Sequence, residues 1–130
     1  ISYVRLKSEL DKWLSRYKRE DKKYILVTNK DGQYRVDLNT LQYLETYNRN
    51  VKLHTENGEI ISYKKMRELE EELEHGNFLR CHSGYLVNLF FVKRVGKLEL
   101  ELTNGERLPI SQPKRKIAMK RLADYWGDRL

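Results

Sequence analysis

The sequence lacks several features that would place it in a familiar class of enzyme or membrane protein. Its 130 residues include one cysteine, Cys81, which excludes an intramolecular disulfide and fits a reducing cytoplasm. Mean hydropathy is −0.80 and no run of apolar residues is long enough to cross a bilayer. Charged residues interrupt the first dozen positions, so no signal peptide is expected. The three histidines and the cysteine lack metal-ligand spacing, and no glycine-rich phosphate loop occurs, so we expect no metal and no cofactor.

Basic residues outnumber acidic ones, and they are unevenly distributed. Lys and Arg number 26 against 19 Asp and Glu, which gives a net charge of +7. Residues 76–98 and 107–122 contain basic side chains and no acid. These stretches flank a predicted hairpin, so we expect them to share one face that binds a phosphate backbone. The alternative is a solvated fringe of Lys and Arg.

The pattern of apolar residues predicts a mainly β domain of compact antiparallel sheets with short helices and helical ends. Ser62 would cap an internal helix over residues 62–75, which Gly76 would end. Ser111 would cap a last helix with Pro113 in its first turn and Ala118, Leu122 and Tyr125 on its buried face. Strands are predicted at residues 24–28, 33–36, 41–46, 51–55, 59–61, 85–92, 98–103 and 107–111.

Residues 1–20 have apolar side chains at helical spacing, and a polar stretch follows them up to residue 23. We interpret residues 1–22 as a helical connector from an upstream domain and residues 23–130 as the functional domain. The chain begins at Ile1 rather than Met, which fits a piece of a longer protein. The alternative is a helix that packs on this domain.

Three polar clusters between apolar runs are candidate sites for contact with nucleic acid. Arg and His can donate to phosphates or base edges, Asn and Gln can pair with adenine, and Arg can pair with guanine. The alternative for each cluster is an ordinary polar turn whose side chains bond to nearby backbone groups. The candidate residues are Asn48, Arg49, Asn50 and Lys52 in the first cluster, Arg80, His82 and Ser83 in the second, and Gln112, Lys114 and Arg115 in the third.

Catalysis is poorly supported, and we expect no enzyme. Cys81 and His82 are neighbours, and adjacent strand residues point to opposite faces, so they cannot form a nucleophile–base pair. Residues 76–98 contain no carboxylate that could orient His82. Cys81 beside Arg80 is either a redox-active thiol or, as we favour, a small buried residue.

Taken together, the motifs resemble the LytTR family of bacterial DNA-binding domains. The resemblance rests on three stretches between about Tyr24 and Leu122, which are residues 44–55, the Leu-x-x-x-Leu helix with Phe78-Leu-Arg80-Cys-His82-Ser-Gly-Tyr85-Leu-Val-Asn88, and Asn104-Gly…Leu108-Pro-Ile-Ser111. It implies small antiparallel sheets that contact DNA through loops and strand ends. It also implies an upstream receiver domain in a two-component system, promoter DNA with paired direct repeats as the partner, and a homodimer on that DNA.

The resemblance assigns DNA contacts to His82, to Arg80, to the turn at residues 48–51 and to position 112. Three positions depart from the family's usual residues. Ser83 stands where Arg, Lys or Asn is frequent, Gly84 where Ser is usual, and Gln112 where Arg is frequent. Losing long donors should alter base readout, because a good bidentate contact contributes about 1–3 kcal/mol of discrimination.

Two other functions fit the composition less well. A basic protein-interaction or dimerisation module without specific DNA readout would show no affinity for duplex DNA at moderate salt. An RNA-binding role is disfavoured because the predicted strands show no clear exposed aromatic pair on which bases could stack.

Overall fold

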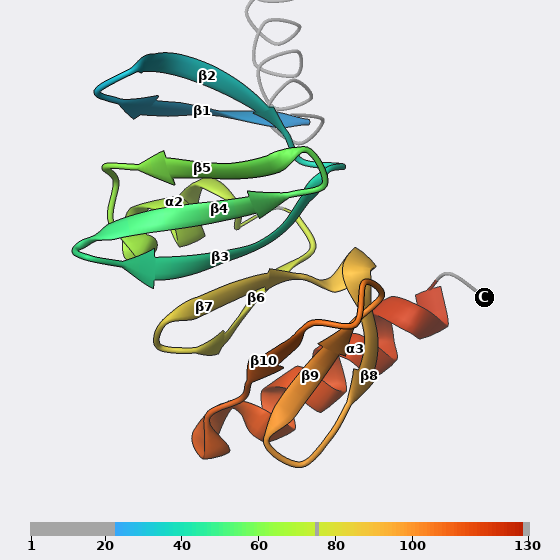
Figure 1. Ribbon diagram of the computed structural model, residues 1–130. Coiled ribbons are helices and arrows are strands. Elements are labelled where there is room, and N and C mark those ends of the chain that lie inside the picture. The colour runs from blue at the N-terminus through green and yellow to red at the C-terminus, as the bar shows by residue number, and fades with distance from the viewer. Residues whose placement is uncertain (1–22, 75, 129–130) are drawn as a thin grey trace, which may run out of the picture.

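The computed structural model describes residues 23–74 and 76–128, which form three antiparallel sheets, two α-helices and two short 3₁₀ turns (Figure 1). The connector predicted for residues 1–22 lies outside the described residues. The elements are β1 (Tyr24–Asn29), β2 (Gly32–Asp37), β3 (Leu41–Tyr47), β4 (Asn50–Thr55), β5 (Gly58–Ser62), α2 (Met66–Glu72), β6 (Phe78–His82), β7 (Tyr85–Asn88), η1 (Leu89–Phe91), β8 (Val92–Val95), β9 (Glu99–Leu102), β10 (Arg107–Pro109), η2 (Gln112–Lys114) and α3 (Arg115–Asp128).

A five-stranded sheet in the order β5-β4-β3-β7-β6 is the central layer of the domain. The β1–β2 hairpin lies beside its β5 edge, where Asn29 Nδ2 donates to the Ile61 carbonyl at 2.8 Å (Figure 1). The three-stranded sheet β10-β9-β8 and helix α3 lie at the other end, next to β6 and β7 (Figure 1). Among the residues that the structure describes, no helix is long and apolar enough to span a membrane.

Each face of the central sheet contributes to its own hydrophobic core. Neighbouring residues on one strand point to opposite sides, so Leu44 and Leu86 enter one core while Tyr43 and Val87 enter the other. The first core lies against α2 and the β1–β2 hairpin, and the second lies against the three-stranded sheet and α3. Ala118 and Leu122 of α3 are buried in the second core, and Tyr125 packs against it, as predicted.

The fold class is confirmed, and three predicted boundaries are wrong. Ser62 ends β5, where it is buried opposite Val51, so α2 begins at Met66 with Lys65 as its N-cap. The apolar run 85–92 is not one strand, because η1 interrupts it after Asn88. Residues 78–82 form strand β6, although their polar side chains suggested a turn.

Asn88 explains the interruption of the run, because its buried side chain fixes three backbone groups. The Oδ1 atom accepts from the Phe90 amide at 3.0 Å and caps η1. The Nδ2 atom donates to the carbonyls of Leu41 at 2.8 Å and Leu38 at 3.3 Å, so it joins β7 to the chain that enters β3. A continuous strand would leave these groups without Asn88 as a partner.

We therefore expect Asn88→Ala to lower the free energy of unfolding by about 2–3 kcal/mol, because it leaves buried backbone carbonyls without a hydrogen-bond donor. Urea denaturation monitored by circular dichroism measures the change. Asn57→Ala, in an exposed turn, is the matched control and should change stability by less than about 0.5 kcal/mol. Equal effects of the two substitutions would contradict a structural role for the Asn88 side chain.

Candidate nucleic-acid interface

The three polar clusters predicted from the sequence meet at one end of the central sheet. The turn between β3 and β4, the turn between β6 and β7, and η2 all lie on the left of Figure 1. The Thr46 amide donates to the Gly84 carbonyl at 3.0 Å, which joins the end of β3 to the β6–β7 turn. The Ser111 amide donates to the Cys81 carbonyl at 2.9 Å, which joins the entrance of η2 to β6. We call this end, made of residues 47–50, 82–84 and 111–115, the turn edge.

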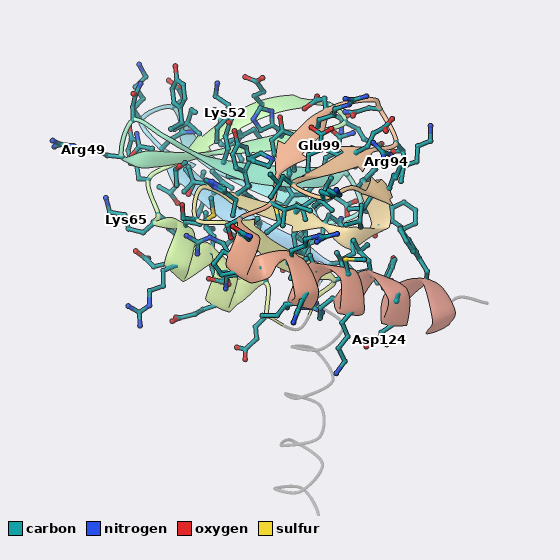
Figure 2. All side chains as sticks on the ribbon, turned by 90° about the horizontal axis from the view of Figure 1, so that it is seen from below. Arg49, Lys52, Lys65, Arg94, Glu99 and Asp124 are labelled. Carbon is teal, nitrogen blue, oxygen red and sulfur yellow. The ribbon has the colours of Figure 1, made fainter. Side chains whose placement is uncertain are left out.

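The β3–β4 turn holds two residues in a left-handed backbone conformation. Asn48 has φ 46° and Arg49 has φ 71°, as a two-residue hairpin turn of this kind requires. Asn tolerates this conformation, but Arg is costly there, and such strain clusters at functional sites. The Lys65 Nζ atom donates to the Arg49 carbonyl at 3.2 Å and fixes the turn against the start of α2. Figure 2 shows the Arg49 side chain extending away from the body of the domain, with Lys65 on the same side.

Two predicted residues that follow this turn are less available than Arg49. Asn50 begins β4 opposite Tyr47 and is half-buried. The Lys52 Nζ atom lies 4.0 Å from the centre of the Tyr47 ring and 3.5 Å from a Glu59 carboxylate oxygen. The ammonium group of Lys52 is therefore already paired with the Tyr47 ring and Glu59 on the face of the sheet.

His82 lies at the β6–β7 turn with a defined ring orientation. Its Nδ1 atom accepts from the Gly84 amide at 3.1 Å, and its ring meets Tyr85 edge-on at 5.8 Å between centroids. A neutral imidazole that accepts at Nδ1 carries its proton on Nε2, so the other edge of the half-exposed ring is a hydrogen-bond donor. Ser83 is exposed beside it.

Gly84 has a steric reason to lack a side chain. A Cβ atom at this position would lie 3.1 Å from Thr46 Oγ1, so the two turns could not approach as closely.

Arg80 faces the protein, although its charge suggested a DNA contact. Its Nη1 atom donates to Glu70 Oε1 at 2.9 Å, its Nε atom donates to the His82 carbonyl at 3.2 Å, and its Nη2 atom donates to the Ser83 carbonyl. A DNA contact by Arg80 stays a prediction, but three of its five donors are already engaged.

In the third cluster, Gln112 and Lys114 are exposed in η2, directly after the bond that joins Ser111 to β6. Arg115 is half-buried, and its Nε atom has no hydrogen-bond partner among the described residues. The exposed long donors at this end of α3 are thus Lys114 and Lys116.

Part of the positive charge of residues 76–98 and 107–122 is paired with acids, and whether the two stretches share a DNA-binding face stays a prediction. Arg94 pairs with Glu101 at 3.3 Å and Arg107 pairs with Glu99 at 3.3 Å, on the three-stranded sheet. Figure 2 shows Arg94 and Glu99 at the opposite side of the domain from Arg49 and Lys65. Neighbouring strands supply the acids that the linear count left out.

A polar network on the open face of β3, β4 and β5 was not predicted from the sequence. The His54 ring stacks on Tyr43 at 4.2 Å, and its Nε2 atom lies 2.6 Å from Glu45 Oε1. The Tyr43 hydroxyl donates to Glu106 Oε2 at 2.6 Å, and burial, with this carboxylate, raises the pKa of Tyr43. The network ties the β9–β10 turn to the central sheet.

With this geometry in place, the comparisons with known proteins identify the family. The model of the LytTR family, described as the LytTr DNA-binding domain, matches residues 31–123. The chain therefore belongs to the LytTR family of DNA-binding domains.

One relative and one solved structure agree with this assignment. The chain is 38% identical over 72 residues to the sensory transduction protein LytT of Oceanobacillus iheyensis, a match that covers 54% of this chain and 29% of that protein. The fold is similar to the LytTr DNA-binding domain of a methyl-accepting/DNA response regulator from Bacillus cereus, with a TM-score of 0.65 and 25% identity. That similarity covers 78% of this chain and 97% of the solved one.

Cys81 is fully buried on β6, while its neighbour His82 is half-exposed, as the alternation predicted. Burial raises the pKa of the Cys81 thiol to about 12, although its own backbone and the charge of Arg80 act in the opposite direction. Only the thiolate reacts, so the folded protein should protect this residue.

We expect a thiol reagent at about pH 8 to modify Cys81 at least about 100-fold more slowly in the native protein than in urea, where the pKa returns to about 8.5. Time-resolved mass spectrometry measures both rates. Comparable rates would favour the reactive-thiol alternative.

Proposed function

We propose that the chain binds promoter DNA sequence-specifically as the output domain of a response regulator, acting in the cytoplasm. One observation supports this most strongly, namely that three separate donor-bearing segments of a LytTR domain converge on the turn edge. Arg49 extends from this edge, His82 presents an Nε2–H donor, and Gln112 and Lys114 are exposed beside them. Apart from η2 and the first residue of α3, the described residues of this surface lie in turns and at strand ends, which would make most of the contacts.

In the same proposal, residues 1–22 connect to a receiver domain and residues 23–130 form the DNA-binding unit. Two copies would occupy direct repeats on one face of the duplex, because each domain presents a single narrow edge. The matched relative is much longer than this chain, which leaves room for such an upstream domain.

Selection of bound duplexes from a random-sequence pool at about 150 mM salt tests the proposal, because non-specific binding is weak there. A recovered consensus with two repeats about one helical turn apart would support it. Recovery of no consensus, with binding only at low salt, would contradict it and favour the protein-interaction module.

We expect His82→Ala to weaken binding to the selected sequence by about 10-fold, because one donor to a base edge is lost, and to leave non-specific binding within about 2-fold. Fluorescence anisotropy on both duplexes measures the ratio. His54→Gln is the control, since that histidine belongs to the network on the sheet face rather than to the turn edge. Equal losses on the two duplexes would remove His82 from base readout.

Lys114→Gln should act differently, because a phosphate contact carries no sequence information. We expect weaker binding to every duplex and a slope of log affinity against log salt that is smaller by about 1. Lys93→Gln is the matched control, since Lys93 is exposed on β8, away from the turn edge (Figure 1). An unchanged slope for Lys114→Gln would exclude a phosphate contact.

A further inference from the structure

An ion pair joins the acidic helix α2 to β6, next to the turn edge. Glu70 Oε1 accepts from Arg80 Nη1 at 2.9 Å, and the side chains are 43% and 22% exposed, so the pair is partly shielded from water. Glu70 is the only acid of α2 that is paired with a residue of β6 among the described residues. Glu70 is therefore the acid of α2 that has a specific partner, Arg80, beside the turn edge.

Arg80 transmits this contact to the β6–β7 turn. Its Nε and Nη2 atoms donate to the carbonyls of His82 and Ser83, the two residues that lead into the turn. The pairing of β6 with β7 shifts register between Arg80 and His82, so the backbone is irregular where Arg80 bonds to it. A planar guanidinium directs fixed, separated donors at two carbonyls and one carboxylate, whereas the three donors of a lysine lie on one nitrogen and lack this fork.

The orientation of the turn backbone sets the orientation of His82. With the His82 and Ser83 carbonyls directed toward Arg80, the next amide, that of Gly84, reaches His82 Nδ1 at 3.1 Å. This bond keeps the ring acceptor inside the protein and leaves the Nε2–H donor on the outer edge. Loss of the Arg80 contacts would free the turn and allow the ring to rotate.

We propose that Glu70 and Arg80 are positioning residues for base readout, with Glu70 holding Arg80 so that Arg80 fixes the turn that aims His82. The inference rests on the proposed function and gives Arg80 an intramolecular role instead of a contact with DNA. It gives Glu70 a structural role on α2, a helix whose negative charge would otherwise only repel DNA.

The substitution Glu70→Gln separates this role from a direct phosphate contact by the sign of its effect. If Arg80 positions the turn, binding to the selected sequence falls by about 5- to 20-fold and non-specific binding stays within about 2-fold. If Arg80 binds phosphate and Glu70 holds it back, the substitution strengthens binding to every duplex and steepens the salt dependence. The second result overturns the proposal.

Glu72→Gln is the matched control, because it removes an acid of the same helix that pairs with Lys64 at 2.9 Å and touches nothing in the turn. We expect this variant to bind both duplexes as the parent does, or slightly more tightly. An effect of Glu70→Gln no different from that of Glu72→Gln would also overturn the proposal. Arg80→Lys keeps the charge and loses the fork, so it should reproduce the Glu70→Gln phenotype, whereas a role of charge alone predicts no change.

A measurement without DNA keeps this test independent of the proposed function. Amide hydrogen exchange of the full chain should show the Gly84 amide exchanging about 10-fold faster in Glu70→Gln than in Glu72→Gln, with the core strands unchanged. If the parent selects no DNA sequence but this difference is seen, the positioning role of Glu70 and Arg80 is supported and the proposed function fails. If the exchange rates of the two variants agree, the positioning role of Glu70 and Arg80 is contradicted, whatever the DNA result.

Discussion

The antiparallel pairing of β3 with β7 is the contact on which the other parts of the domain depend. Leu44 lies opposite Leu86 and contributes with it to the first hydrophobic core, and Tyr43 lies opposite Val87 and contributes with it to the second. The pairing also places the end of β3 beside Gly84, which brings two of the three polar turns together. Because a slip of one residue would exchange the two faces of a strand, the register that fills the cores also fixes the geometry of the turn edge.

Local patterns in the sequence predicted the fold class, the hairpin at residues 29–32 and the buried face of α3, because each depends on side chains a few residues apart. The split after Asn88 was missed since its cause is a bond to Leu41, far away in the chain. Strand β6 was missed because Arg80 and His82 read as turn residues, whereas both bond to the turn that follows. The pairing of Arg94 and Arg107 with acids was missed for a related reason, since their partners come from the neighbouring strand β9.

The electrostatics of the domain separate the edge from the sheet face. Lys65 and Arg49 lie together at the turn edge, while Lys52 and His54 are held by the carboxylates of Glu59 and Glu45 on the open face of the sheet. Net positive charge can draw the whole chain toward DNA, and at the turn edge Arg49 and Lys114 form no ion pair with an acid among the described residues. A charge count over the sequence therefore indicated the partner more reliably than it indicated the surface.

The departures at positions 83, 84 and 112 from the residues usual in the family acquire different meanings in three dimensions. Gly84 lies close to Thr46 Oγ1, so a side chain at this position would make a tight contact, and the absence of one favours the packing of this turn against the end of β3. Ser83 and Gln112 do shorten the reach of their segments, and the long side chain at this edge is instead Arg49, on a backbone conformation that is costly for it. On the proposed function, discrimination at the edge shifts toward the β3–β4 turn, where a guanidinium can contact guanine through two donors.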